Sequence, residues 1–370
     1  MSTPGSIEEP VILREIKVSV YTIPTDIPES DGTMEWDRTT LVLVEITAGG
    51  KKGLGFTYAD AAVGLFIDRT LKPFLVGKPV HDIAATTNEM IRQIRNNGSC
   101  GMAMMAVSAV DTALWDLKAK ILGVSVCALL GQVRDTMPLY GSGGFTSYTE
   151  KQTQMQFEGW ATQGITHFKM KIGREPANDL HRVRAARRAI GREAVLMVDA
   201  NGAYTVRQAL EMAEAFSEYR VSWLEEPVSS DNLAGLCFIR EHLRHNCAIA
   251  AGEYGYNLPY FEAMLRAGAV DVLQADITRC GGMTYLLKTG YLCEGHQLPF
   301  STHCAPSLHL PAALALPSFY IAEYFHDHIR IESMLFEGVP APVGGCLAAD
   351  TGRPGFGLEF KYADAQKYRV

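Results

Sequence analysis

The sequence has no Cys-x-x-Cys pair, although it contains eight cysteines. These cysteines are scattered, and most lie inside apolar segments, so we expect reduced, buried thiols in a cytoplasmic protein. Residues 1–10 lack a basic stretch followed by an apolar core, and a secretory signal peptide is therefore not expected.

Uninterrupted apolar runs and excess positive charge are also missing. The apolar stretch 102–122 contains four charged residues, Asp111, Asp116, Lys118 and Lys120, which favours a buried amphipathic helix over a membrane span. The net charge is −7, so nucleic acid is not expected as a partner. A local cationic or metal site can still attract an acidic substrate.

The first third of the chain predicts an α+β module. The chain has 370 residues, enough for two domains or for a barrel with a smaller module. β-Branched and apolar residues predict strands at 12–21 and 39–47, joined by a polar loop at 22–38. A loop of this length in a compact domain is usually disordered or functional. Helical patterns follow at 70–75, 82–97 and 101–122. We place this module at residues 1–135.

From about residue 136 the pattern changes to short apolar runs that alternate with longer amphipathic ones. Eight runs predict strands, at 138–143, 167–173, 195–201, 222–227, 247–253, 270–277, 299–304 and 319–324. Repeated strand–helix units in this number predict an α/β chain with a (β/α) barrel at residues 136–335. An open doubly wound sheet would favour a Gly-rich phosphate loop, to which residues 141–144 are only a weak approximation. Residues 336–370 lose the pattern and are expected to return to the first module.

Two lysines stand out in the second predicted strand. Lys169 and Lys171 are two residues apart, so they lie on the same face of the strand. Neighbouring ammonium groups disfavour charge on each other, and burial adds to this, so at least one pKa is expected closer to neutrality. Such a lysine can act as a general base. The alternative is a pair of exposed lysines on an edge strand.

The following strands carry acidic residues near their ends. Asp199, Glu225 and Glu253 end the third, fourth and fifth predicted strands, and barrel chemistry is found at the carboxyl ends of strands. Converging carboxylates need a compensating cation, and oxygen ligands suit Mg²⁺. Taken singly, each acid is more typical of a helix N-cap or a surface group. Asp276, His303 and Glu323 follow on the sixth, seventh and eighth strands.

This order of residues resembles the enolase superfamily, specifically its mandelate racemase subgroup (mandelate racemase/muconate lactonizing enzyme family). Lys-x-Lys, Asp-x-Asn, Glu-Glu-Pro, Gly-Glu, Asp and His follow one another on successive strands. Residues 109–117 resemble the helix that joins the capping domain of the family to its barrel, and residues 352–358 resemble its closing segment. The resemblance implies a (β/α)7β TIM-like barrel with an N-terminal α+β capping domain that the C-terminal segment completes.

The resemblance also implies roles for individual residues. Asp199, Glu225 and Glu253 would bind one Mg²⁺ per active site. Lys171 and His303 would be the two bases. The remaining roles concern the partners of these groups: Lys169 adjacent to the substrate carboxylate, Asp276 paired with His303, and Glu323 hydrogen-bonded to the substrate carboxylate. Taken alone, His303 is equally compatible with a core histidine bonded to a carbonyl.

Less specific signals suggest substrate contacts. Asn201 follows a metal-ligand candidate on the same face of the strand and could contact metal or substrate. Capping loops carry specificity in this family, and the remaining substrate-binding candidates are Tyr21, Trp36 and Ser142. The resemblance implies a small-molecule carboxylate substrate and a homo-oligomer, from dimer to octamer; no nucleic acid or membrane partner is expected.

Three functions fit these residues. The first is a Mg²⁺-dependent lyase that removes the proton α to a carboxylate, giving an enediolate, and dehydrates an acid sugar (an aldonate, aldarate or tartrate-like acid) to a 2-keto acid. The second is a racemase or epimerase of a 2-hydroxy or sugar acid, in which Lys171 and His303 exchange a proton across opposite faces. The third is a binding or regulatory protein without turnover. The complete set of residues argues against it, because such a protein needs neither both bases nor all three ligands.

Overall fold

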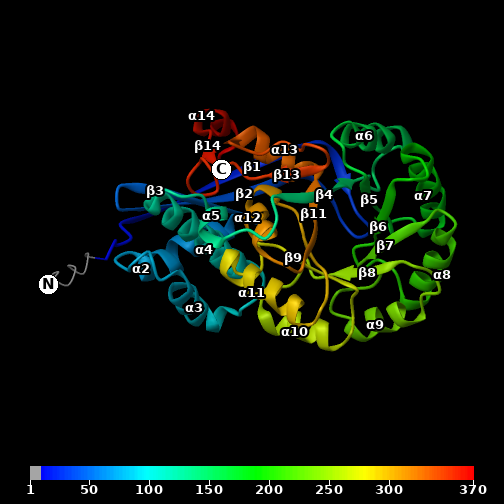
Figure 1. Ribbon diagram of the computed structural model, residues 1–370, viewed down its shortest axis with the longest axis horizontal. Coiled ribbons are helices and arrows are strands. Elements are labelled where there is room, and N and C mark those ends of the chain that lie inside the picture. The colour runs from blue at the N-terminus through cyan, green and yellow to red at the C-terminus, as the bar shows by residue number, and fades with distance from the viewer. Residues whose placement is uncertain (1–9) are drawn as a thin grey trace.

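The computed structural model describes residues 10–370 and has an elongated shape, with a capping domain at one end and a barrel at the other (Figure 1). The capping domain begins with an antiparallel sheet of three strands, β1 (Glu15–Ser30), β2 (Glu35–Ala48) and β3 (Lys51–Tyr58). Helical segments follow: α1 (Ala62–Phe66), a π-helix (Ile67–Leu71), α2 (Lys72–Leu75), α3 (Ile83–Gln93), a 3-10 turn (Arg95–Asn97), α4 (Gly101–Leu122) and α5 (Val126–Leu130).

The polar segment 22–38 is a hairpin of two long strands, so its prediction as a loop is wrong. Strand β1 continues to Ser30 and β2 already starts at Glu35, and the register shifts between Pro24 and Glu29. The extension mixes exposed residues with three buried ones, Ile23, Glu29 and Ser30. A strand in this position needs only backbone pairing, which the composition of the segment does not reveal.

The barrel prediction is confirmed. Eight parallel strands pair in chain order, and β11 closes the ring by pairing with β4. The strands are β4 (Thr136–Gly143), β5 (His167–Lys171), β6 (Val195–Asp199), β7 (Val221–Glu225), β8 (Ala248–Ala251), β9 (Val272–Ala275), β10 (Phe300–Thr302) and β11 (Phe319–Phe325).

Seven helices connect these strands and cover the outside of the barrel, which gives the (β/α)7β arrangement. They are α6 (Glu150–Thr162), α7 (Pro176–Ile190), α8 (Val206–Ser217), α9 (Leu233–His242), α10 (Leu258–Arg266), α11 (Gly282–Gly295) and α12 (Pro306–Ala315). Inside the barrel, Met197, Trp223 and Ile321 belong to one apolar cluster. Each of these lies two residues before an acid (Asp199, Glu225 and Glu323), so the cluster forms the floor beneath the acids.

The C-terminal segment returns to the capping domain, as expected. It follows α13 (His326–Leu335) and contains β12 (Phe336–Glu337), β13 (Cys346–Ala348), β14 (Glu359–Phe360), α14 (Tyr362–Ala365) and a 3-10 turn (Gln366–Tyr368). Phe360 packs against Tyr21 of β1, with ring centroids 5.0 Å apart, and β13 pairs with β4. Within residues 10–370, no helix combines the length and the apolar character needed to cross a membrane.

Candidate active site

A cavity of about 550 Å³ lies at the carboxyl ends of the barrel strands, and both domains line it. The capping domain contributes residues that include Asp31, Met34, Trp36, Arg38, Tyr58 and Asp60. The barrel contributes residues that include Lys171, Asn201, Glu253, Arg279, His303 and Cys304. A larger cavity of about 610 Å³ lies elsewhere, against the C-terminal segment, and is lined by none of these residues.

The three predicted metal ligands lie together. Asp199 ends β6, Glu225 ends β7 and Glu253 follows β8, and each offers a carboxylate oxygen within 4.8 Å of the other two. All three side chains are buried. Trp223 Nε1 and Gln274 Nε2 donate to Glu225 Oε2 at 2.9 and 3.0 Å, whereas Glu253 Oε2 is buried without a hydrogen-bond partner. This oxygen-only set with an orphaned carboxylate oxygen fits a hard divalent cation.

The two lysines point into this cluster of carboxylates. Lys169 Nζ lies 2.5 Å from Glu225 Oε1 and 2.9 Å from Glu323 Oε1, and Lys171 Nζ lies 2.5 Å from Asp199 Oδ2. The alternative of exposed lysines is therefore wrong, since the two side chains are buried.

The charges around the lysines reverse the expected pKa shift. Burial alone would lower the pKa of Lys169, but Glu225 and Glu323 outweigh it and raise that pKa. Burial also opposes the charge of Lys171, and Asp199 is the main cause that raises its pKa. The expectation that a lysine titrates closer to neutrality is thus wrong for this arrangement, because carboxylates outnumber the ammonium groups.

His303 and Asp276 form a hydrogen-bonded pair. His303 Nδ1 lies 2.8 Å from Asp276 Oδ2, which directs Nε2 toward Glu253 Oε2 at 3.4 Å and Glu323 Oε2 at 3.8 Å. Burial would raise the pKa of Asp276, but the hydrogen bond and charge of His303 lower it below its usual value. Because Nδ1 is held by a carboxylate, the ring of His303 has a fixed orientation.

His309 is a residue that sequence reasoning missed. It is fully buried on α12, and its Nε2 accepts from Ile277 N–H at 2.9 Å. Its Nδ1 donates to the carbonyls of Cys304 at 2.9 Å and Ala305 at 3.0 Å. Cys304 and Ala305 both have positive φ values, 54° and 37°, a strained conformation for residues with side chains. His309 thus ties the chain after Asp276 to the chain after His303.

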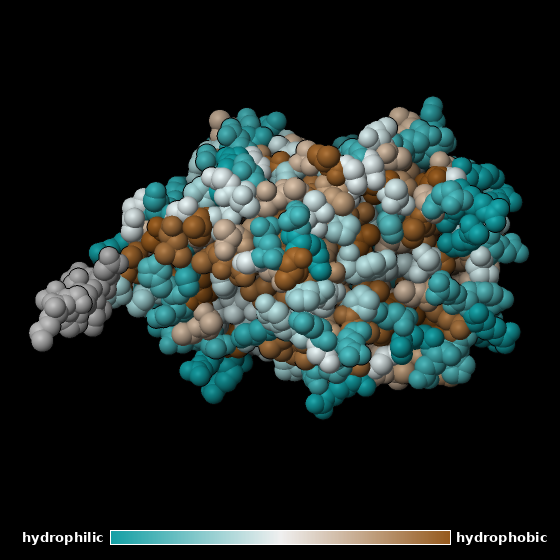
Figure 2. All heavy atoms as spheres, in the orientation of Figure 1, coloured by the Kyte–Doolittle hydropathy of each residue, from teal (hydrophilic) through white to brown (hydrophobic). Residues whose placement is uncertain are grey.

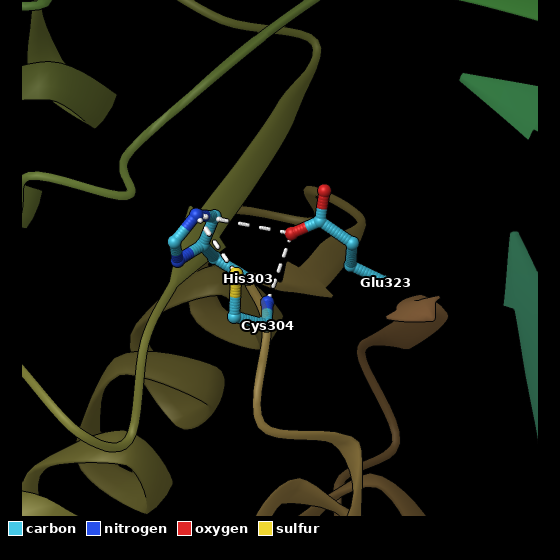
Figure 3. A group of neighbouring side chains, drawn as sticks. All are labelled: His303, Cys304 and Glu323. Atoms are coloured by element: carbon cyan, nitrogen blue, oxygen red, sulfur yellow. Dashed lines mark hydrogen bonds and ion pairs between the residues drawn. The ribbon is translucent and has the colours of Figure 1, made fainter. Parts of the chain in front are cut away.

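Glu323 and Cys304 lie beside the imidazole of His303 (Figure 3). The backbone N–H of Cys304 donates to Glu323 Oε2 at 2.9 Å, and Cys304 Sγ lies 3.2 Å from His303 Nε2. Burial would raise the pKa of Glu323, but the charge of Lys169 is the main influence that lowers it well below its usual value. In the sequence, only the position of Cys304 directly after His303 indicates that this thiol belongs to the site.

The four substrate-binding candidates have different surroundings. Trp36 and Asn201 line the cavity, and Trp36 Nε1 donates to Glu29 Oε2 at 2.9 Å. Ser142 is fully buried on β4, opposite Lys169 of β5, rather than on the cavity wall. Tyr21 is not among the residues that line the cavity, because it packs in the core against Phe360 of the C-terminal segment, so its prediction as a substrate contact is wrong.

Two further residues line the cavity. His328 is buried and stacks on Tyr58 with ring centroids 3.5 Å apart. Arg279 lies 3.6 Å from both Glu253 Oε1 and Asp276 Oδ2. Its guanidinium therefore links a metal-ligand candidate to the acid that holds His303.

Comparisons with known proteins agree with this geometry. Residues 152–365 match the family model "Enolase C-terminal domain-like", and residues 15–131 match "Mandelate racemase / muconate lactonizing enzyme, N-terminal domain". The chain is 31% identical to the L-talarate/galactarate dehydratase of Salmonella typhimurium, over 84% of this chain and 80% of that protein. It is 29% identical to the 3,6-anhydro-alpha-L-galactonate cycloisomerase of Streptomyces coelicolor, over 94% and 96%.

Solved structures show the same fold. A mandelate racemase/muconate lactonizing enzyme-like protein from Rubrobacter xylanophilus superposes with a TM-score of 0.95 at 51% identity, over 97% of this chain and all of that chain. The Salmonella dehydratase, crystallised with Mg and L-lyxarohydroxamate, superposes with a TM-score of 0.90 at 27% identity, over 100% of this chain and 96% of that chain. The resemblance noted in the sequence is confirmed, and the chain belongs to the mandelate racemase/muconate lactonizing enzyme family of the enolase superfamily.

Proposed function

We propose that this protein is a Mg²⁺-dependent acid-sugar dehydratase, which removes the proton α to a carboxylate and then the β-hydroxyl to give a 2-keto acid. The observation that carries this proposal is the presence of two potential bases, Lys171 and His303, on the wall of one cavity, together with Glu253 of the three clustered carboxylates. Relatives named as acid-sugar dehydratases and cycloisomerases support the substrate class.

Asp199, Glu225 and Glu253 would hold the magnesium ion, in keeping with magnesium in the crystal structure of the Salmonella relative. When bound, Mg²⁺ supplies positive charge next to the substrate carboxylate, where negative charge develops as the α-proton leaves. Among the three ligands, Glu253 is the one with a carboxylate oxygen, Oε2, that is buried without a hydrogen-bond partner, so it has most to gain from a cation.

Lys171 and His303 would share the proton transfers. A divalent cation on Asp199 would compete for the carboxylate that now holds Lys171 at 2.5 Å, so its ammonium would lose its main stabilising partner and its pKa would fall. In the neutral imidazole of His303, with Nδ1–H donating to Asp276, Nε2 is the nitrogen that can accept a proton at its cavity side. Lys169 would donate a hydrogen bond to the substrate carboxylate. Glu323, whose pKa the charge of Lys169 holds well below its usual value, would have to take up a proton before it could do the same.

Dehydration requires a proton for the departing β-hydroxyl, and protonated His303 would supply it. The rest of the cavity wall suits a polyhydroxy chain, because Asp31 and Asp60 of the capping domain and Asn201 of the barrel offer polar groups to it. A racemase or epimerase would use the same two bases but would return the proton to the opposite face of the α-carbon. Racemisation or epimerisation therefore differs from dehydration in its product and not in the residues that it uses.

A screen of hexaric, pentonic, hexonic and tartaric acids with the Mg²⁺-loaded protein tests the proposal. Formation of a 2-keto acid that carries solvent deuterium at C3, the former β-carbon, is the expected result for at least one acid. Deuterium uptake at the α-carbon with inversion of its configuration, but without formation of a keto acid, would show that the protein is a racemase or epimerase and not a dehydratase. Neither keto acid nor deuterium uptake with any member of the set would overturn the proposal, provided that calorimetry shows Mg²⁺ bound.

A further inference from the structure

A second group of metal-ligand atoms lies beside the three carboxylates. His303, Cys304 and Glu323 offer a nitrogen, a sulfur and an oxygen atom that all lie within 4.8 Å of one another. His303 Nε2 is 3.2 Å from Cys304 Sγ and 3.8 Å from Glu323 Oε2. Figure 3 shows the three side chains converging on a common point. Zinc bonds of about 2.0–2.3 Å place tetrahedral ligand atoms roughly 3.3–3.7 Å apart, so the two distances from His303 Nε2 need only small adjustments.

The surroundings of these ligands resemble those of a metal site. Asp276 Oδ2 accepts from His303 Nδ1 at 2.8 Å, the outer contact that orients a zinc-bound histidine and fixes its tautomer. The carboxylate of Glu323 is held by the Cys304 backbone N–H at 2.9 Å and by Lys169 Nζ at 2.9 Å. Since both contacts belong to the fold itself, the donors are already oriented before any ion arrives.

The donor types distinguish this group from its neighbour. Thiolate and imidazole favour zinc-like ions, whereas an all-carboxylate set favours magnesium. His303 and Cys304 both line the cavity of about 550 Å³, which provides an entry path. Glu253 Oε2, 3.4 Å from His303 Nε2, faces the same space.

We propose that His303, Cys304 and Glu323 form a second metal site, specific for Zn²⁺ and related thiophilic cations and separate from the three-carboxylate site. On binding, the thiol S–H bond of Cys304 is broken, its proton goes to solvent, and the sulfur bonds the ion without any change of oxidation state. The ion occupies His303 Nε2. Zn²⁺ therefore blocks the base at this position and inhibits turnover even when Mg²⁺ is saturating; this last consequence rests on the proposed function, while binding itself does not.

Cobalt provides a spectroscopic test on the full-length protein. Co²⁺ is titrated in the presence of saturating Mg²⁺, and thiolate-to-cobalt charge-transfer absorption is recorded. The absorption should reach its maximum at one equivalent of Co²⁺ per chain, and it should be absent in Cys304→Ser. It should persist in Asp199→Asn, which disables the neighbouring site, and in Cys100→Ser, the matched control at an exposed cysteine. Absence of the band in the unmodified protein, or its persistence in Cys304→Ser, overturns the proposal.

A second measurement avoids any dependence on the folding of a variant. The unmodified protein is treated with a small thiol-alkylating reagent with and without Zn²⁺, and the modified cysteines are identified by mass spectrometry. Zn²⁺ should protect Cys304 and leave Cys100 reactive. Equal modification of Cys304 with and without Zn²⁺ contradicts the site.

Turnover of the substrate found in the screen tests the inhibition separately. Zn²⁺ should inhibit at saturating Mg²⁺, and Cys304→Ser should raise the inhibition constant by at least about tenfold. Relief of inhibition by additional Mg²⁺ would show that Zn²⁺ acts at the three carboxylates, and would contradict the inhibitory consequence. If the cobalt–thiolate band is seen but no acid is turned over, the metal site stands and only the proposed function is contradicted.

Discussion

At the residue scale, the active site is a balance between acids and two lysines. Lys169 and Lys171 are buried and lie within 2.5 Å of Glu225 and Asp199 respectively. Buried charges are tolerated when each has a close partner of opposite sign. Glu253 lacks such a partner for its Oε2, so this residue is the most informative position for testing the metal site.

Replacement of Glu253 by Gln should remove magnesium binding and leave the fold intact. Its Oε2 makes no hydrogen bond, so the melting temperature of the metal-free variant should match that of the metal-free parent. The rise in melting temperature that Mg²⁺ causes in the parent should disappear, because ligand binding stabilises only through the native state. Calorimetric titration with Mg²⁺ checks this result, and unchanged Mg²⁺ affinity in the variant would refute the ligand assignment.

The acids at the strand ends were predictable, and some of their neighbours were not. Asp199 and Glu225 each end an apolar strand, a pattern that is legible in the sequence. The roles of Cys304, His309 and His328 depend on contacts between separate strands and helices, which a local pattern does not contain. Tyr21 was misplaced because its position next to a polar segment says nothing about its packing against Phe360.

At the element scale, the hairpin of β1 and β2 forms the roof of the cavity. Glu29 lies fully buried in this hairpin and accepts from Trp36 Nε1 at 2.9 Å. Burial, followed by the charge of Asp327, raises the pKa of Glu29 to about 9. The carboxyl group is therefore protonated in the folded protein at neutral pH, whereas it is ionised in the unfolded chain.

Glu29→Gln should change how stability depends on pH. The folded state binds the Glu29 proton more tightly than the unfolded state. The contribution of this group to the free energy of unfolding is therefore fully present below pH 4.5 and is lost as the pH rises toward 9. Glutamine does not titrate, so the melting temperature of the variant minus that of the parent should grow as pH rises from about 5 to 9. Glu35→Gln, at an exposed position in the same hairpin, is the matched control, and a constant difference for Glu29→Gln would contradict the assignment.

His309 on α12 should be a structural clamp between the ends of β9 and β10. In His309→Leu, the Ile277 N–H and the carbonyls of Cys304 and Ala305 lose their buried partner. Each orphaned buried group costs about 1–3 kcal/mol, and urea unfolding should show a loss of that order or greater. His309→Gln can restore the acceptor for Ile277 N–H and should lose less; equal stability of the leucine variant and the parent would contradict the clamp.

At the scale of the whole molecule, repetition made the barrel predictable. Eight short apolar runs separated by amphipathic segments fit few folds other than a barrel. The strands do pair in chain order around a closed ring. The hairpin over its mouth was not predictable, because pairing between β1 and β2 extends into residues with the composition of a loop. The limits of the domains at residues 135/136 and 335/336 stay a prediction.

Assembly also stays a prediction at this scale. We expect a homo-oligomer, as the resemblance to the family implied. Sedimentation velocity should give a mass that is at least twice the 40.5 kDa of one chain. A single boundary at the mass of one chain over a wide concentration range would contradict this expectation.

The central claim is that Lys171 and His303 serve opposite faces of one α-carbon. They extend from opposite parts of the barrel, Lys171 on β5 and His303 just after β10. Exchange of the α-proton with deuterium oxide, followed by NMR on each epimer of the substrate, tests this claim most directly. His303→Asn should lose overall turnover by about 10²–10⁴-fold yet retain exchange on the epimer that presents its proton to Lys171. Lys171→Ala should retain exchange on the other epimer, and equal exchange of the same epimer by both variants would contradict the account.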